Sequence, residues 1–181
     1  SLLGKEIFIK FIKGYTEKQW LKSTKELPKF LIKRIPVRFT FDNNYFFDKF
    51  QGIPINGYTE IFYKLLNGIE VRLNNNYFDN RDMFNSLAKN IIYTGPIDKY
   101  YNYKYGVLEY RPLEFQNKTL DIENFQGHSV INYTSSEVPY TRIIEHKHFN
   151  NDKSKCTIIT KEFPVKFRKN AELFYPINDV V

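Results

Sequence analysis

The chain of 181 residues has one cysteine, Cys156, and only three histidines. No intrachain disulfide can form, and a zinc site built from several cysteines is excluded. No apolar run approaches the roughly 18 residues that a membrane-spanning helix needs, and the first residues lack the pattern of a secretory signal peptide. These absences favour a reduced, cytoplasmic setting for the protein.

Phosphate-binding glycine loops are also missing. The sequence contains neither GxGxxG nor GxxxxGK[ST], so it carries no glycine loop of its own that cradles a phosphate. No Ser/His/Asp set and no pair of carboxylates stands out as catalytic machinery. His146 and His148 lie two residues apart on one predicted strand, which could suit a metal. Packing or surface roles are commoner for such a pair, and we assign no metal.

Aromatic residues and positive charge are what the sequence has in excess. Aromatic residues make up 18% of the chain, with 14 Tyr and 17 Phe, and the formal net charge is +7. Tyrosine combines an apolar ring with a polar tip, which suits the binding of a sugar or a base. A basic surface attracts anions in general, so phosphorylated metabolites, nucleic acid and anionic lipid stay open. No nucleic-acid-binding motif supports the second of these.

Hydrophobic periodicity predicts an α+β fold, with helices early and an antiparallel sheet late. We expect a helix over residues 2–13 that Gly14 ends, and short helical turns at the capping-box patterns that begin at Thr16 and Ser23. Further helices are predicted over 58–66, before Gly68, and over 83–89. Alternating or β-branched runs predict strands at these segments: 69–73, 91–94, 107–116, 127–134, 140–149 and 156–167.

Two groups of residues are candidates for ligand binding. Phe11, Tyr15 and Trp20 would form an aromatic wall if helical turns bridge them, although core packing is the ordinary role of such a stripe. Arginine is scarce beside lysine, and Arg34 and Arg142 each carry a planar fork that can grip a phosphate with two hydrogen bonds. Ion pairs at the surface are the alternative role for these arginines.

Many strings in one order closely resemble the UDP-galactopyranose mutase family. They cover nearly the whole chain, and it is their number and order, not any single motif, that carries the resemblance. The strings are residues 14–20 (GYTEKQW), 25–28, 32–40 (IKRIPVRFT), 42–46, 51–54, 57–59, 93–98 (YTGPID), 138–149 (VPYTRIIEHKHF) and 174–179.

The resemblance implies a specific activity. The family interconverts UDP-galactopyranose and UDP-galactofuranose, the precursor of galactofuranose in cell-surface glycans, with FAD in its reduced form and a covalent adduct at the flavin N5. UDP-galactose and UDP-galactofuranose are the implied partners. Nucleic acid and a membrane span are not implied, and homo-oligomerisation stays open.

Residue roles follow from the same resemblance. Arg34 and Arg142 correspond to the two arginines that hold the diphosphate, which must be stabilised as the glycosidic bond breaks. The tyrosine hydroxyls that add hydrogen bonds to it correspond to Tyr45 and Tyr175. The uracil-stacking pair corresponds to Phe11 and Tyr15, and the indole near the sugar to Trp20. No residue is assigned to the cofactor.

The sequence also departs from the family pattern. The family begins with a glycine-rich, Rossmann-like FAD segment and ends with further active-site residues, and both are missing from these 181 residues. We therefore expect a piece of the enzyme, inactive alone, organised as a helical substrate-binding segment (1–40), partial FAD-domain elements (41–95) and a sheet-based substrate domain (96–181). Residues 69–78 and 91–95 would supply strands to the FAD sheet. Leu21 stands where glycine is usual.

A different class of function stays open beside the mutase. The chain could be a non-enzymatic module that binds a nucleotide sugar or an anionic glycan after losing the flavin. A GxGxxG segment upstream of this chain in the complete gene would separate the mutase from the binding module.

Overall fold

The computed structural model describes residues 4–28, 40–41, 46–168, 172 and 174–176. The chain divides into two compact units: unit 1 comprises Ser1–Lys49 with Leu108–Val181, and unit 2 comprises Phe50–Val107. The predicted α+β class is confirmed by the short helices and the antiparallel sheet. Among the described residues, no helix has both the length and the hydropathy required to span a membrane.

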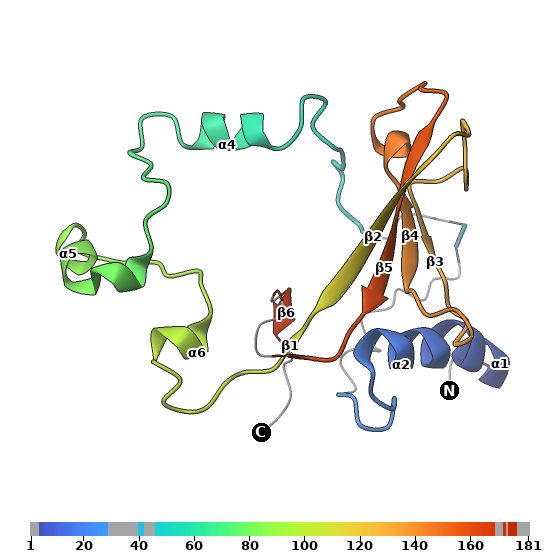
Figure 1. The fold of residues 1–181 in the computed structure, drawn as a ribbon, viewed down its shortest axis with the longest axis horizontal. Helices are drawn as coiled ribbons and strands as arrows, with labels where there is room; N and C mark the ends of the chain where they lie inside the picture. The colour runs from blue at the N-terminus through green and yellow to red at the C-terminus, as the bar shows by residue number, and fades with distance from the viewer. Residues whose placement is uncertain (1–3, 29–39, 42–45, 169–171, 173, 177–181) are drawn as a thin grey trace. The chain divides into compact units, whose positions relative to one another are not determined.

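A four-stranded antiparallel sheet is the centre of unit 1 (Figure 1). Its spatial order is β2 (Leu113–Leu120), β5 (Thr157–Pro164), β4 (Arg142–Glu145) and β3 (Val130–Asn132). Strands β3, β4 and β5 lie within segments predicted to be strands, whereas β2 begins in the predicted segment 107–116 and continues to Leu120. The predicted segment 140–149 ends as a 3-10 turn, η3 (His146–Phe149). A separate two-stranded ladder joins β1 (Tyr110–Arg111) to β6 (Tyr175–Pro176).

The two inner strands carry the most buried part of the sheet. Ile143 on β4 and Ile159 on β5 expose only 1% and 3% of their surfaces. Register pairs Ile143 with Lys161 and Ile159 with Glu145, so the two isoleucines share one face of the sheet. On the opposite face, Arg142 lies directly across from Glu162. This register brings two opposite charges together across neighbouring strands.

The N-terminal helix is longer than the sequence predicts. It comprises α1 (Lys5–Ile7), a π-helical segment η1 (Phe8–Lys13) and α2 (Gly14–Trp20). The prediction that Gly14 ends the helix is wrong, and so is the separate turn predicted at Thr16. The turn at Ser23 is confirmed, because the Ser23 N–H donates to Glu26 Oε2 at 3.2 Å. Helix α2 lies at the end of the sheet where β5 finishes and β4 begins (Figure 1).

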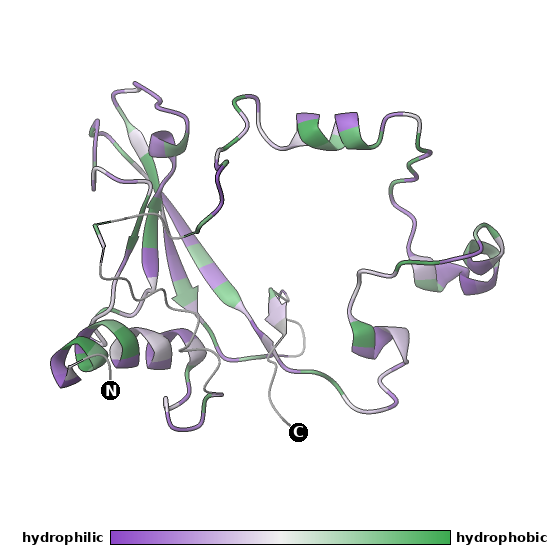
Figure 2. Cartoon of the chain, turned by 180° about the vertical axis from the view of Figure 1, so that it is seen from behind, coloured by the Kyte–Doolittle hydropathy of each residue, from purple (hydrophilic) through white to green (hydrophobic). Residues whose placement is uncertain are grey.

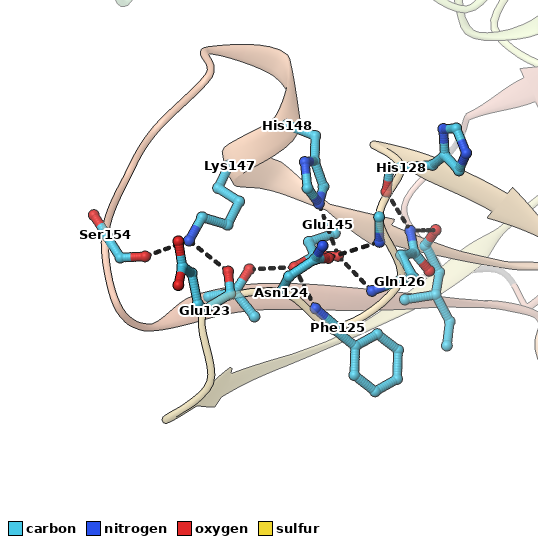
Figure 3. Close-up of polar contacts among 12 residues, drawn as sticks. Glu123, Asn124, Phe125, Gln126, His128, Glu145, Lys147, His148 and Ser154 are labelled. Carbon is cyan, nitrogen blue, oxygen red and sulfur yellow. Dashed lines mark hydrogen bonds and ion pairs between the residues drawn. The ribbon is translucent and has the colours of Figure 1, made fainter.

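Buried polar groups fix the other end of β4 (Figure 3). The Glu145 carboxylate accepts hydrogen bonds from the N–H groups of Phe125 and Gln126, at 2.9 and 2.8 Å, and from Thr157 Oγ1. Burial alone would raise the pKa of Glu145, but these hydrogen bonds lower it below its ordinary value. The Lys147 ammonium donates to the carbonyls of Glu123 and Ser154. Together these contacts hold the loops at this end of the sheet.

Unit 2 has helices but no strand, and all of its residues are described. Its elements are α4 (Thr59–Leu65), η2 (Tyr77–Asp79), α5 (Arg81–Ser86) and α6 (Ile97–Tyr100). The helices predicted over 58–66 and 83–89 are confirmed with small shifts of their ends. The strands predicted over 69–73 and 91–94 are absent from this structure. The assignment of 69–78 and 91–95 to the sheet of a FAD domain stays a prediction.

The apolar side chains of unit 2 stay in contact with solvent. No residue in 50–107 is buried, and Phe62 and Leu65 on α4 are 58% and 66% exposed. Figure 2 shows that α4 carries both hydrophobic and hydrophilic residues. An aromatic cluster organises its second half, where the Arg81 guanidinium lies 4.8 Å from the centre of the Tyr100 ring. Unit 2 therefore has local aromatic packing without a buried core.

Candidate functional site

Helix α2 is docked onto the loop that connects β3 to β4. The Lys18 ammonium donates to the carbonyl oxygens of Tyr133, Ser135 and Val138 at 2.6, 2.7 and 3.0 Å. Burial lowers the pKa of Lys18 below its ordinary value. A Cβ atom at Gly14 would lie 2.8 Å from the Thr134 carbonyl oxygen, so only glycine permits this close approach. Gly14 therefore serves helix docking and does not end the helix.

This docking brings Tyr15 to the first residue of β4. Arg142 Nη2 donates a hydrogen bond of 3.1 Å to the Tyr15 hydroxyl. On its other edge, Arg142 Nε lies 3.3 Å from Glu162 Oε1 on β5. Tyr15 and Glu162 thus fix the guanidinium from two sides. An arginine carries five N–H donors, so these two contacts with described residues leave further donors that can bind an anion.

A second arginine, Arg111, lies between two aromatic rings of the same unit. Its guanidinium carbon is 4.8 Å from the centre of the Trp20 ring and 4.8 Å from that of Tyr175. The pairing of β1 with β6 places Arg111 opposite Tyr175. This arrangement is a cation stacked between aromatic faces.

The environment of Arg111 links it to the Arg142 pair. Burial lowers the pKa of Arg111; Tyr175 and Glu162 raise it, and the charge of Arg142 lowers it further. Its Nε is buried and has no hydrogen-bond partner among the described residues. A buried N–H donor without an acceptor lowers the stability of a protein. Arg111 Nε is therefore a candidate to donate a hydrogen bond to a ligand.

The structure therefore brings together four of the residues predicted from the sequence: Tyr15, Trp20, Arg142 and Tyr175. Phe11 lies on η1, four residues before Tyr15, and is 60% exposed. Arg34 and Tyr45 lie outside the described residues. The sequence analysis missed Arg111 and Glu162. The available signal for Arg111 was an arginine between Tyr110 and Pro112, in the middle of the predicted strand 107–116.

The two histidines considered as metal ligands have other partners. His146 Nε2 lies 2.7 Å from Thr160 Oγ1, and His148 Nε2 lies 3.1 Å from Glu145 Oε2. Across the part of the chain that the structure describes, no group of three His, Cys, Asp or Glu side chains is placed to hold a metal ion.

Unit 2, all of whose residues are described, contains no buried polar side-chain atom without a hydrogen-bond partner. Among described residues, the buried polar side-chain atoms without a hydrogen-bond partner lie in unit 1: Arg111 Nε, Gln126 Oε1, Arg142 Nε and His148 Nε2. Of these, Arg142 Nε and His148 Nε2 lie within ion-pair distance of Glu162 and Glu145. The 181 residues also contain no glycine loop for a pyrophosphate. The residues present do not by themselves fit a dinucleotide cofactor, so we assign none of them to one.

Comparison with known proteins gives the same family over almost the whole chain. The family model described as "GLF: UDP-galactopyranose mutase" matches residues 10–181. The chain is 40% identical to a probable UDP-galactopyranose mutase of Klebsiella pneumoniae and 38% identical to a dTDP-fucopyranose mutase of Escherichia coli, each over 98% of its length. It is 32% identical, over 93% of its length, to a UDP-galactopyranose mutase of Mycoplasma genitalium.

These relatives are longer proteins. The matched regions cover 46%, 48% and 46% of the Klebsiella, Escherichia and Mycoplasma genitalium proteins. The chain thus spans about half the length of the curated relatives it matches.

Proposed function

The chain belongs to the UDP-galactopyranose mutase family, and we propose that it supplies the nucleotide-sugar site of an enzyme that interconverts UDP-galactopyranose and UDP-galactofuranose. The observation that carries this proposal is the cluster of two arginines and three aromatic residues in unit 1. Arg142 contacts Tyr15, and Arg111 lies between Trp20 and Tyr175. A UDP-sugar needs cations for its diphosphate and flat apolar faces for its two rings.

Each member of the cluster has a proposed task. Arg142, together with Arg34, binds the diphosphate and stabilises its charge as the bond to the sugar breaks. The hydroxyls of Tyr175 and Tyr45 add hydrogen bonds to the same group. Arg111 strengthens the positive potential and orients the two rings on which it stacks.

The aromatic residues contact the uracil and the sugar, which are the two ends of the ligand. Phe11 and Tyr15 stack on the uracil, and Trp20 faces the sugar. Since Tyr15 also holds Arg142, the base-binding and diphosphate-binding parts of the site are directly connected. Binding of the uridine would therefore help to orient the arginine that acts at the diphosphate.

Reduced FAD is the cofactor that the family implies, and we include it in the proposal for the complete enzyme. It would supply the nucleophile that displaces UDP from the anomeric carbon. The residues of this chain bind and orient the nucleotide sugar and stabilise the UDP that leaves and returns. We propose the cytoplasm as the compartment.

One observation favours a second sugar nucleotide. The Escherichia coli relative is named a dTDP-fucopyranose mutase, and its identity of 38% is close to the 40% of the probable UDP-galactopyranose mutase. Both names share a nucleoside diphosphate joined to a pyranose. Arginines that bind a diphosphate and aromatic faces that stack on a pyrimidine serve either ligand.

The test is conversion by the full-length protein under reducing conditions. UDP-galactofuranose and dTDP-fucofuranose are offered separately, and chromatography follows the corresponding pyranose. Faster conversion of the UDP-sugar supports the proposal, and faster conversion of the dTDP-sugar supports the second candidate. Binding of UDP without conversion of either sugar would favour a non-enzymatic binding module.

A further inference from the structure

Glu162 is a buried carboxylate inside a site that is otherwise cationic. Its exposed fraction is 7%. Its Oε1 accepts a hydrogen bond of 2.6 Å from Thr141 Oγ1 and lies 3.3 Å from Arg142 Nε. Thr141 is fully buried and also donates its backbone N–H to the Glu162 carbonyl at 2.8 Å. The carboxylate is therefore held in one position by its own strand pairing.

A buried carboxylate needs a strong reason to be there. Taking a charge out of water is costly unless an opposite charge compensates it. Arg142 provides that compensation, and the negative charge of Glu162 also acts on Arg111. The charges of Arg142, Arg111 and Glu162 add up to one net positive charge. Without Glu162, the two guanidiniums would repel each other with no internal counter-charge.

Resting on the proposed function, we propose that Glu162 is a resident counter-ion that competes with the diphosphate for Arg142 and so limits how tightly the site holds UDP. In the free protein it stabilises the paired arginines. In the complex it repels the incoming anion, because both negative groups face the same guanidinium. UDP must leave the sugar and return to it. Binding the ground state more tightly than this requires does not increase turnover.

The charge of the ligand should decide the size of this effect. UDP carries one more negative charge than UMP, and uridine carries none. A counter-ion therefore weakens UDP most, UMP less and uridine hardly at all. A carboxylate that served only to build the fold would affect the binding of all three ligands alike.

The experiment replaces the carboxylate by its uncharged isostere in the full-length protein. Glu162→Gln keeps an oxygen that can accept from Thr141 and removes the charge. Calorimetric titration should show the Kd of UDP falling about tenfold, that of UMP falling less and that of uridine unchanged. The UDP affinity of the variant should also fall more steeply with added salt than that of the parent. Glu162→Asp, which retains the charge, should stay within about threefold of the parent.

Glu114→Gln is the matched control, because Glu114 is an exposed carboxylate on β2 of the same sheet. It should leave the Kd of UDP unchanged. Weaker binding of UDP and uridine alike in Glu162→Gln would overturn the proposal, and so would an equal gain in the Glu114 variant. Should Glu162→Gln fail to fold, Arg142→Gln is compared with Arg142→Gln plus Glu162→Gln. With Arg142 replaced, the comparison measures the repulsion between Glu162 and the diphosphate that the proposal requires. The double variant should bind UDP more tightly, and equal affinities would overturn the proposal.

Inorganic pyrophosphate separates this inference from the proposed function. A parent protein that binds pyrophosphate but not UDP would contradict the nucleotide-sugar site. In that case, tighter binding of pyrophosphate by Glu162→Gln would still support the proposed counter-ion role of Glu162. Unchanged binding of pyrophosphate would contradict that role. A parent that binds neither probe would contradict both.

Discussion

Arg142 and Tyr15 are 127 positions apart in the chain, yet Arg142 Nη2 donates a hydrogen bond of 3.1 Å to the Tyr15 hydroxyl. One residue begins an inner strand of the sheet, and the other lies on the N-terminal helix. Lys18 and Gly14 fix the helix against the β3–β4 loop, so the contact depends on how two distant segments pack. The site is a product of this docking.

Replacing Arg142 should lower turnover by more than any loss of protein stability can explain. Arg142→Ala in the full-length protein should lower turnover by roughly 100- to 1000-fold, or about 3 kcal/mol, because a charge-assisted contact to the leaving diphosphate is lost. Arg142→Lys should recover only part of the activity, since lysine lacks the planar fork. Arg34→Ala should show a loss of similar size.

The matched control is Arg168→Ala, because Arg168 is an exposed arginine of unit 1. Turnover and thermal unfolding are measured for all four variants. Arg142→Ala also leaves Glu162 without its cation, so its melting temperature should fall. Turnover near that of the parent in Arg142→Ala would show that this arginine does not bind the diphosphate.

Tyr15 should act mainly on binding. Tyr15→Ala removes the ring and should raise the KM for the UDP-sugar by about tenfold or more, with a much smaller fall in kcat than Arg142→Ala. Tyr15→Phe keeps the ring and loses only the hydrogen bond to Arg142, at a cost of about 1 kcal/mol. Steady-state kinetics separates the two effects. A fall in kcat with unchanged KM in Tyr15→Ala would argue against stacking on the uracil.

Leu21 is strained where the helix ends. It follows Trp20 with φ 52° and ψ 27°, the left-handed region in which a side chain is unfavourable. Leu21→Gly should therefore stabilise the protein by up to about 1 kcal/mol in denaturant unfolding. We also expect the segment around Trp20 to move when the ligand binds. This movement, followed by Trp20 emission after rapid mixing with UDP and with other tryptophans replaced, should be faster in Leu21→Gly than in the parent.

Asn151→Gly provides the comparison for Leu21. Asn151 has φ 50°, but asparagine tolerates the left-handed region, so the gain there should be smaller. Equal changes at the two positions would show that Leu21 carries no special strain.

Glu145 should make the stability of the protein sensitive to acid. The folded state lowers its pKa, so the unfolded state binds more protons near and below pH 4.3, the approximate pKa of an unperturbed Glu. The stabilisation is complete above that pH and is lost as the pH falls through the folded pKa. The difference in unfolding free energy between the parent and Glu145→Gln should shrink over this range.

Glu137→Gln, at an exposed carboxylate of the same unit, is the control for acid sensitivity. Its stability should follow that of the parent at every pH. If the gap between the parent and Glu145→Gln stayed constant down to pH 3, the hydrogen bonds of the Glu145 carboxylate would not be the source of the acid sensitivity.

Local sequence patterns predicted the helices and strands of this protein better than they predicted the contacts between them. The strands of the sheet follow from β-branched and aromatic runs, and helix α4 ends before Gly68 at φ 78° as expected. Gly14 misled the prediction because its lack of a side chain serves packing against Thr134. The residues 69–78 and 91–95 have strand-like composition, but a strand also needs a partner, which local composition does not specify.

The site shows the same division. Tyr15, Trp20, Arg142 and Tyr175 could be nominated from residue chemistry and family resemblance. Glu162 could not, because an alternating glutamate on a predicted strand is ordinarily exposed. Its importance comes from the register that places it opposite Arg142. Arg111 likewise gains its meaning from the pairing of β1 with β6, two segments distant in sequence.

A structure of the full-length protein with UDP tests the central claim most directly. We expect the diphosphate to lie within hydrogen-bond distance of Arg142 and the uracil to stack on Tyr15. Trp20 should lie at the end of the diphosphate to which the sugar attaches. Density for UDP at another place, with Arg142 and Tyr15 in contact only with each other and with Glu162, would contradict it.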